Sequence, residues 1–416
     1  MNCAVITFPG NNCETETARA AIRNGFKTDI IRWNQIEKIG AYDFYILPGG
    51  FSFEDRGRSG MIAAREPIFQ ALRAEAQKGK IILGICNGAQ MVVESGLIPV
   101  DDNPHPYALT HNIRRNKTGA IMGTGFYNEW TYLKVERTNT AFTQNITKPL
   151  HVPFAHGEGR FTSVDSKALE ALKSGTHVAF RYSDKSGKVD PHFPITPNQS
   201  DFGVAAITNV EGTVMAIMPH PERYFQLFDG DQIFQSVADW ITHKKSPQTV
   251  RIVHTQVSEQ PKFKPFPFPS KTKKAQSTLH FSKKLIITDN ESFSVRSLAQ
   301  TITGEDIKLE KNWHYTITTT NSLSPTEINQ IIHRQLIHNA HKEILTPDPF
   351  ISANTYAVSD FQNDEVAHLA QKLSQWFSQE VQVQIYTCWD FCDTNRSVID
   401  TILQHQILHN PNSGEI

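Results

Sequence analysis

The feature that most constrains the fold of this chain is an alternation of short apolar runs and helical patterns over residues 1–243. The apolar runs are short enough for strands and read CAVITFP, TDIIRW, YDFYILPGG and KIILGIC. Stretches 14–24 and 62–78 between them have the pattern of helices. Strands that alternate with helices predict an α/β fold, in which an open, mostly parallel sheet has helices on both faces.

Three glycine-bearing turns follow predicted strands, namely FPG, PGG and GICNG. In open parallel sheets, ligands bind beyond the carboxyl ends of the strands. The sequence therefore predicts one crevice at which the three turns meet.

The composition favours a soluble protein of the cytoplasm. Lys and Arg number 41 and Asp and Glu number 42, so the net charge of −1 argues against general binding to nucleic acid or anionic membranes. The five cysteines are odd in number and are not spaced as a disulfide framework, which favours a reducing compartment. No apolar stretch is long enough to span a bilayer, and no basic region precedes the first apolar run.

A change of composition near Lys244 predicts a second domain, as a chain of 416 residues would suggest. We expect a Lys- and Pro-rich linker over 244–282 and a small α+β domain over 283–416. In that domain LIIT (285–288) and HYTITTT look like strands, and SFSVRSLAQTI looks like a helix.

Ser324, Pro325 and Glu327 predict a capped helix start, because Ser caps, Pro suits the first turn and Glu three residues on closes a capping box. The apolar stripe of that helix is formed by Ile328, Ile331, Ile332 and Leu336. A weak internal repeat relates residues 334–344 to 405–416, which suggests a unit built twice, although so short a match also arises by chance.

Cys86 lies in a Gly-x-Cys-x-Gly turn between a predicted strand and a predicted helix. Glycines on both sides allow the close approach and strained backbone of a nucleophile elbow. A helix N-terminus also lowers the pKa of a thiol and offers an amide to an oxyanion. The alternative is that Cys86 is a small buried apolar residue, which is the usual fate of cysteine.

His220 and Glu222 are the candidate partners of Cys86, in the stretch AIMPHPERYF that follows an apolar strand. Alternate residues of an extended segment point the same way, so both side chains can face one site. His220 would take the thiol proton and Glu222 would orient the imidazole. The alternative is a surface ion pair.

Together these motifs resemble the class I, or triad, glutamine amidotransferases. The resemblance covers about residues 1–243 and is carried by GICNGAQ, PGGFSFED, HGEGRF and MPHPER. VITFPGNNCE and HGEG narrow it to the glutaminase components of phosphoribosylformylglycinamidine synthases. One departure is EDRGRSG after PGGFSF, where a Gly-Asp followed by an apolar or aromatic residue is expected. The other is the extra chain after residue 243.

The resemblance implies a flavodoxin-like fold and a glutaminase that releases ammonia from glutamine through a thioester on Cys86. The expected catalytic residues are Cys86, His220 and Glu222. The expected oxyanion donors are the backbone amides of Gly50 and Asn87. The expected substrate contacts are Gln90, His156, Glu158 and Arg58, although HGEG is equally compatible with a tight structural turn.

We expect no cofactor and no metal in this chain, which has no GxxxxGK[ST] phosphate loop. The resemblance implies that ATP and magnesium bind a separate synthetase chain, which would be the partner. The tail faintly resembles the small adaptor component of the same synthase, or the matching domain of the large one. Cys388 and Cys392 in CWDFC have no second Cys/His pair close by in the sequence, so core packing or exposed thiols are preferred to a metal site.

Two rival hypotheses remain at this point. A degenerate amidotransferase could sense glutamine without hydrolysing it, and an intact Cys86, His220 and Glu222 argue against that. Another cysteine hydrolase or a chaperone on the same sheet would lack the PHPE ending.

Overall fold

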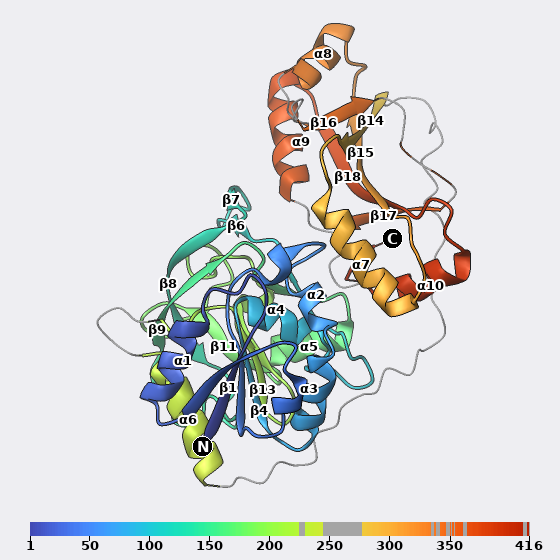
Figure 1. Cartoon of the computed structure of the whole chain (residues 1–416). Helices are drawn as coiled ribbons and strands as arrows, with labels where there is room; N and C mark the ends of the chain where they lie inside the picture. Colours follow the sequence, from blue (N-terminus) through green and yellow to red (C-terminus); the bar gives the residue numbers. More distant parts are fainter. Residues whose placement is uncertain are drawn as a thin grey trace. The chain divides into compact units, whose positions relative to one another are not determined.

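The computed structural model divides the chain into two compact units, Met1–Gln256 and Val257–Ile416, which are described separately (Figure 1). The described residues are 1–223, 229–243, 277–333, 337, 342–346, 350, 352, 354–360, 364–410 and 414–415. Within them, no helix is long and apolar enough to cross a membrane.

The first unit is built on a nine-stranded sheet. Its strands are, in spatial order, β2 (Lys27–Arg32), β1 (Asn2–Thr7), β3 (Phe44–Leu47), β4 (Ile81–Ile85), β13 (Val214–Ile217), β12 (Val204–Thr208), β11 (Val178–Ser183), β8 (Tyr127–Val135) and β9 (Leu150–His156). The first five are parallel, and the pairings from β13 to β9 are antiparallel. The predicted α/β class is confirmed.

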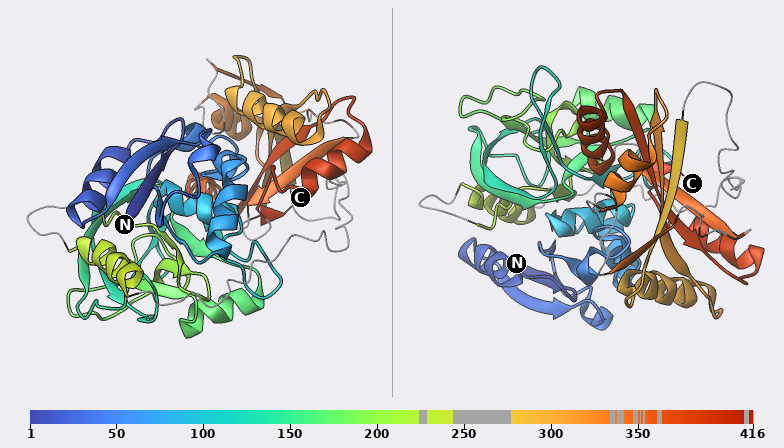
Figure 2. Two further views of the ribbon diagram at one scale, coloured as in Figure 1. Left: turned by 60° about the horizontal axis from the view of Figure 1, so that its bottom comes forward. Right: turned by 90° about the horizontal axis from the view of Figure 1, so that it is seen from above.

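Helices cover both faces of this sheet. Figures 1 and 2 show α1 and α6 on one side and α2, α3 and α4 on the other. The helices are α1 (Glu14–Arg23), α2 (Met61–Ala64), α3 (Ile68–Gln77), α4 (Asn87–Glu94), α5 (Ser166–Ser174) and α6 (Asp231–Thr242). The single helix expected over 62–78 is two helices, because Pro67 has no N–H to continue the first.

Short elements complete the unit. Two small antiparallel pairs join β5 (Ala108–Thr110) to β10 (Arg160–Thr162), and β6 (Ile113–Arg115) to β7 (Ile121–Thr124). Three 3₁₀ turns are η1 (Ile36–Lys38), η2 (Ser52–Asp55) and η3 (Asp201–Gly203).

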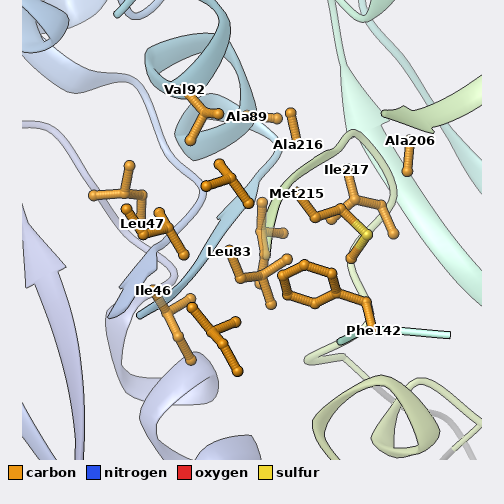
Figure 3. Close-up of a cluster of buried hydrophobic side chains, with 14 of the residues drawn as sticks. Ile46, Leu47, Leu83, Ala89, Val92, Phe142, Ala206, Met215, Ala216 and Ile217 are labelled. Atoms are coloured by element: carbon orange, nitrogen blue, oxygen red, sulfur yellow. The ribbon is translucent and has the colours of Figure 1, made fainter. Parts of the chain in front are cut away.

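The core of the first unit forms where β4 lies between β3 and β13. All five residues of β4 are buried, as expected for a central strand with both faces covered. Figure 3 shows Leu83 of β4 beside Met215 of β13, with Val92 of α4 on one side and Phe142 on the other. This packing fixes the end of β4, from which Cys86 projects.

In its described residues, the second unit has a six-stranded antiparallel sheet and four helices. Its strands are, in spatial order, β16 (Glu343–Thr346), β14 (Ser277–Leu285), β15 (Glu310–Thr319), β18 (Val381–Asp390), β17 (Thr355–Asp360) and β19 (Gly414–Glu415). The helices are α7 (Asn290–Thr303), α8 (Pro325–His333), α9 (Asp364–Phe377) and α10 (Arg396–Gln404). The expected α+β domain is thus present.

The first strand of this unit, β14, does not lie where the sequence predicted a strand, at 285–288. It begins at Ser277, inside the segment expected to be linker, and ends at Leu285, where LIIT was expected to begin a strand. Ile286 and Ile287 lie beyond the strand and are exposed. The helix and strand expected next correspond to α7 and β15.

The order of elements in the second unit repeats. The chain runs β14–α7–β15–α8–β16 and then β17–α9–β18–α10–β19. The sheet order is symmetric about the central antiparallel pair β15–β18, so each strand of one half has a counterpart in the other. The similar segments 334–344 and 405–416 follow α8 and α10, which are counterparts.

The start of α8 has the expected capping box. The Glu327 carboxylate accepts from the Ser324 backbone N–H at 2.7 Å, and the Ser324 hydroxyl accepts from the Glu327 N–H. Ile328, Ile331 and Ile332 pack into the core of the unit, and Leu336 lies outside the described residues.

All five cysteines are free thiols. Cys388 is fully buried in β18, and burial raises the pKa of its thiol to about 12, which fits the expected packing role. Cys392 is only partly buried.

Candidate active site

Cys86 lies at the junction of β4 and α4 with the backbone of a nucleophile elbow. Its φ is +52° and its ψ is −108°, a conformation that L-residues rarely adopt. A Cβ on Gly84 would lie 2.4 Å from the carbonyl oxygen of Gly88, and one on Gly88 would lie 1.9 Å from that of Leu47. Only glycines therefore allow this strand and helix to approach so closely.

His220 and Glu222 follow β13, the strand next to β4. His220 Nδ1 lies 2.6 Å from Glu222 Oε1, and both side chains are buried, with exposures of 2% and 0%. The His220 N–H donates to the carbonyl of Pro153 at 2.8 Å, which anchors the segment. This burial excludes the surface ion pair that the sequence left open.

The electrostatic interactions of His220 with Glu222 and Cys86 raise the pKa of the His220 imidazole. Burial lowers the pKa of His220, but the Glu222 carboxylate and the nearby Cys86 sulfur outweigh it and raise the pKa to about 10. A histidine held beside a cysteine is the arrangement in which an adjacent base activates a thiol nucleophile. The arrangement suits nucleophilic attack followed by proton transfer.

A cavity of about 240 Å³ opens beside Cys86. It is smaller than the roughly 300–1,000 Å³ typical of ligand pockets, so it suits a molecule of amino-acid size. The predicted site residues that line it are Gly50, Cys86, Gln90, His156, Glu158 and His220. The structure thus brings together motifs that lie far apart in the sequence.

Of the two expected oxyanion donors, Gly50 lines the cavity, whereas Asn87 directly follows Cys86 and is not among the lining residues in the described chain. Gly50 has a φ of +142°, and a Cβ there would lie 2.5 Å from the Cα of Asn11. Asn87 is the first residue of α4, where backbone N–H groups have no partner within the helix. Its side-chain oxygen accepts from the Ser52 N–H at 2.9 Å, which ties the PGG turn to the helix.

Gln90 and Glu158 are joined by a hydrogen bond from the Gln90 amide to the Glu158 carbonyl at 2.6 Å. The Gln90 side-chain oxygen accepts from Asn87 at 2.9 Å. Gln90 therefore holds the HGEG segment against α4 at the cavity.

His156 is buried and neutral. Burial, and secondarily the charge of His220, lower the pKa of His156 to about 3. Its Nε2 has no hydrogen-bond partner among the described residues, while a Cβ on Gly159 would lie 2.2 Å from the ring. HGEG is thus a tight turn and also part of the cavity wall.

Arg58 lies elsewhere than expected. Its guanidinium forms a bidentate ion pair with the Glu94 carboxylate, with N···O distances of 2.7 and 2.9 Å. Within the described chain it does not line the cavity. The geometry thus assigns Arg58 a bond to α4 in place of a contact with the ligand.

Three titratable residues of the cavity wall were not predicted from the sequence, namely Cys13, Asp55 and Arg223. Arg223 donates to the Cys13 sulfur at 3.0 Å. Burial and the nearby charge of Glu158 raise the pKa of Asp55 to about 7. All three lie inside motifs that the sequence analysis quoted, and that position was the available signal.

Comparison with known proteins gives one consistent result. Residues 1–248 match the model of the CobB/CobQ-like glutamine amidotransferase domain. The phosphoribosylformylglycinamidine synthase subunit PurQ of Methanothrix thermoacetophila is 38% identical over an alignment of 264 residues that covers 59% of this chain and 100% of that protein. Its counterpart in Aquifex aeolicus is 38% identical over 54% of this chain and 91% of its own length. The solved structure of PurLQS from Thermotoga maritima has 32% identity and a TM-score of 0.46, covering 58% of this chain and 98% of that chain.

Proposed function

This chain belongs to the glutamine amidotransferase family, and we propose that it is the glutaminase component of a phosphoribosylformylglycinamidine synthase. The observation that carries the proposal is the elbow at Cys86 beside the buried His220–Glu222 pair. The relatives named PurQ match essentially over their full length, which supports the same role in purine biosynthesis.

The reaction starts from glutamine in the cavity. The Cys86 sulfur attacks the side-chain amide carbon, and His220 protonates the leaving nitrogen so that ammonia departs. A γ-glutamyl thioester remains on Cys86. His220 then takes a proton from water, which attacks the thioester and releases glutamate. Because Nδ1 of His220 is held by Glu222, the other ring nitrogen serves Cys86 and the water.

The oxyanion of each tetrahedral intermediate would be stabilised by the backbone N–H groups of Gly50 and Asn87. Both come from rigid elements, namely a glycine turn tied to α4 and the first residue of α4 itself. A donor of this kind typically contributes about 10²–10³ in rate.

The amino-acid end of glutamine would lie toward Asp55 and Glu158. These two carboxyl groups repel each other, so a cation between them, such as the α-ammonium group, would relieve the repulsion. The unpartnered Nε2 of His156 offers a neutral hydrogen-bonding group in the same wall. Gln90 supports this wall from α4.

The ammonia would be used by a partner chain. Joining it to a nucleotide substrate needs ATP and magnesium, which we assign to a separate synthetase component in the cytoplasm. The second unit, with its two similar halves, would serve as the adaptor that docks this partner.

A glutamine-sensing binding subunit is the second candidate, and the complete triad speaks for hydrolysis over sensing alone. Cys86→Ala tests this. In the reconstituted synthase it should abolish synthesis from glutamine and leave synthesis from ammonium salts, because the thiol serves only to release ammonia. An alkylating glutamine analogue should label Cys86 in preference to the other four cysteines, as mass spectrometry of the peptides would report. Glutamate release at the normal rate by the variant would contradict the proposal.

A further inference from the structure

Cys13 is a second thiol in the active-site cavity, and the reaction above does not use it. It lies at the start of α1 and is 1% exposed. A Cβ placed on Gly49 would lie 2.9 Å from the His220 ring and 3.1 Å from the Cys13 sulfur. It would also lie 3.5 Å from the Cβ of Cys86. The Cys13 sulfur, the His220 ring and the Cβ of Cys86 therefore surround one point.

Cys13, His220 and Glu222 form a compact set of metal-binding groups. One ligand atom from each lies within 4.8 Å of the other two, and all three side chains are buried. Ligands of a tetrahedral zinc ion lie roughly 3.5 Å apart, so small side-chain rotations would bring these atoms into place. Sulfur, imidazole nitrogen and carboxylate oxygen are the donors that zinc prefers.

A second observation points to a missing partner at this place. Oε1 of Glu222 is bonded to His220, but Oε2 has no hydrogen-bond partner among the described residues although it is buried. An unpaired buried carboxylate oxygen is costly. A bound cation would satisfy it.

A positively charged side chain, that of Arg223, already lies beside Cys13 and Glu222. Arg223 donates to the Cys13 sulfur at 3.0 Å, and its Nε lies 3.4 Å from Glu16 and 3.9 Å from Glu222. Its side chain is 36% exposed, so it can move toward solvent when a divalent ion takes its place.

We propose that Cys13, His220 and Glu222 form an inhibitory site for zinc or a similar soft divalent cation. On binding, the Cys13 S–H bond and one N–H bond of the His220 imidazolium break, both protons pass to solvent, and sulfur–metal and nitrogen–metal bonds form without any oxidation. The metal takes His220 away from Cys86, so the thiol loses its proton acceptor and glutamine hydrolysis stops. Removal of the metal by a chelator restores the pair.

Zinc binding to the full-length Cys86→Ala chain tests the proposal without any dependence on activity. We expect one zinc ion per chain, measured by competition with a chromophoric chelator. Adding Cys13→Ser should weaken binding by at least about tenfold, since even the loss of a residue that only hydrogen-bonds to a metal ligand costs about 10–100-fold in metal affinity. The matched control is Cys3→Ser in the same background, because Cys3 is also fully buried but lies in β1.

X-ray absorption at the zinc edge identifies the zinc ligands in the Cys86→Ala chain itself. Its result therefore does not depend on whether the Cys13→Ser variant folds. One sulfur and two nitrogen or oxygen neighbours are expected from the protein. No binding, a first shell without sulfur, or equal affinities with and without Cys13 would each overturn the proposal. In the active enzyme, Cys13→Ser should raise the zinc concentration for half inhibition of glutaminase by a similar factor.

Discussion

Among single residues, His220 and Glu222 have different tasks, and their substitutions should differ in size. His220→Ala removes the proton carrier, so glutaminase kcat should fall by several orders of magnitude. Glu222→Gln keeps a hydrogen-bond acceptor for Nδ1 but removes the charge that raises the pKa of His220, so the loss should be smaller. Steady-state kinetics of both variants decide this. A larger loss for Glu222→Gln would mean that the carboxylate takes part in the chemistry.

Residues could be predicted from the sequence where their local motif by itself indicates a catalytic role. A cysteine between glycines, and a histidine two residues before a glutamate at a strand end, can be interpreted without a fold. Cys13 and Asp55 could not be assigned in this way, because their proximity to the triad comes from tertiary packing. Arg223 follows Glu222 directly, but its contact with Cys13 forms only in the folded chain. Arg58 shows the converse, since a guanidinium that suits a substrate is bound to Glu94.

The turn after β3 contains the sequence EDRG, which departs from the family pattern, and its backbone has several left-handed residues. Phe53, Glu54 and Asp55 all have left-handed φ values, of 51°, 60° and 52°. Glu54 occupies the position where the family resemblance leads us to expect glycine, which adopts this conformation without strain. A left-handed non-glycine residue costs roughly 1–2 kcal/mol. Its ion pair with Arg56 is exposed and therefore contributes little.

Glu54→Gly should therefore stabilise the first unit by up to about 1 kcal/mol, measured as the free energy of unfolding in urea. Glu54→Ala is the matched control, because it also loses the ion pair but keeps the strained φ. We expect Gly to exceed Ala in stability. Equal stabilities of the Gly and Ala variants would show that the backbone at this position is not strained.

The strands that were not predicted from the sequence have weak hydrophobic patterns. The antiparallel strand β8 has mixed burial along its length, and only two of its nine positions are fully buried, so it lacks the apolar run of β4. β14 starts among Ser, Thr and Lys residues that resemble linker composition. Such strands are specified by their neighbours in the sheet, a non-local effect that composition does not carry.

At the scale of the whole molecule, buried neutral histidines should make the protein sensitive to acid. Burial lowers the pKa of His105 and of His177 to about 4 and that of His156 to about 3. Their unfolded pKa is about 6.5, so the unfolded chain binds more protons below that pH. Stability from these groups is complete above pH 6.5 and is lost as the pH falls toward 3. His220, with its raised pKa, has the opposite sign, and its contribution is lost as the pH rises from 6.5 toward 10.

Urea unfolding at pH 6.5 and pH 4.5 measures this loss, and His177→Gln should make it smaller. His177 lies outside the cavity, so the substitution leaves the active site in place. An unchanged difference between the two pH values in His177→Gln would contradict a neutral buried His177.

The division into two units predicts that a chain ending at His243 remains folded. The first unit has its own core, α6 ends at Thr242, and a relative is matched over its full length by 59% of this chain. If the second unit docks the synthetase partner, the shortened chain should bind that partner more weakly. On that hypothesis, covalent connection would raise the effective concentration of the second unit beside the partner, and a separate fragment would lack this advantage. Activity with glutamine should therefore fall more than activity with ammonium salts, and a separate 277–416 fragment should restore part of the loss. Equal partner affinity and equal glutamine-dependent synthesis in the short and full chains would exclude a docking role for the second unit.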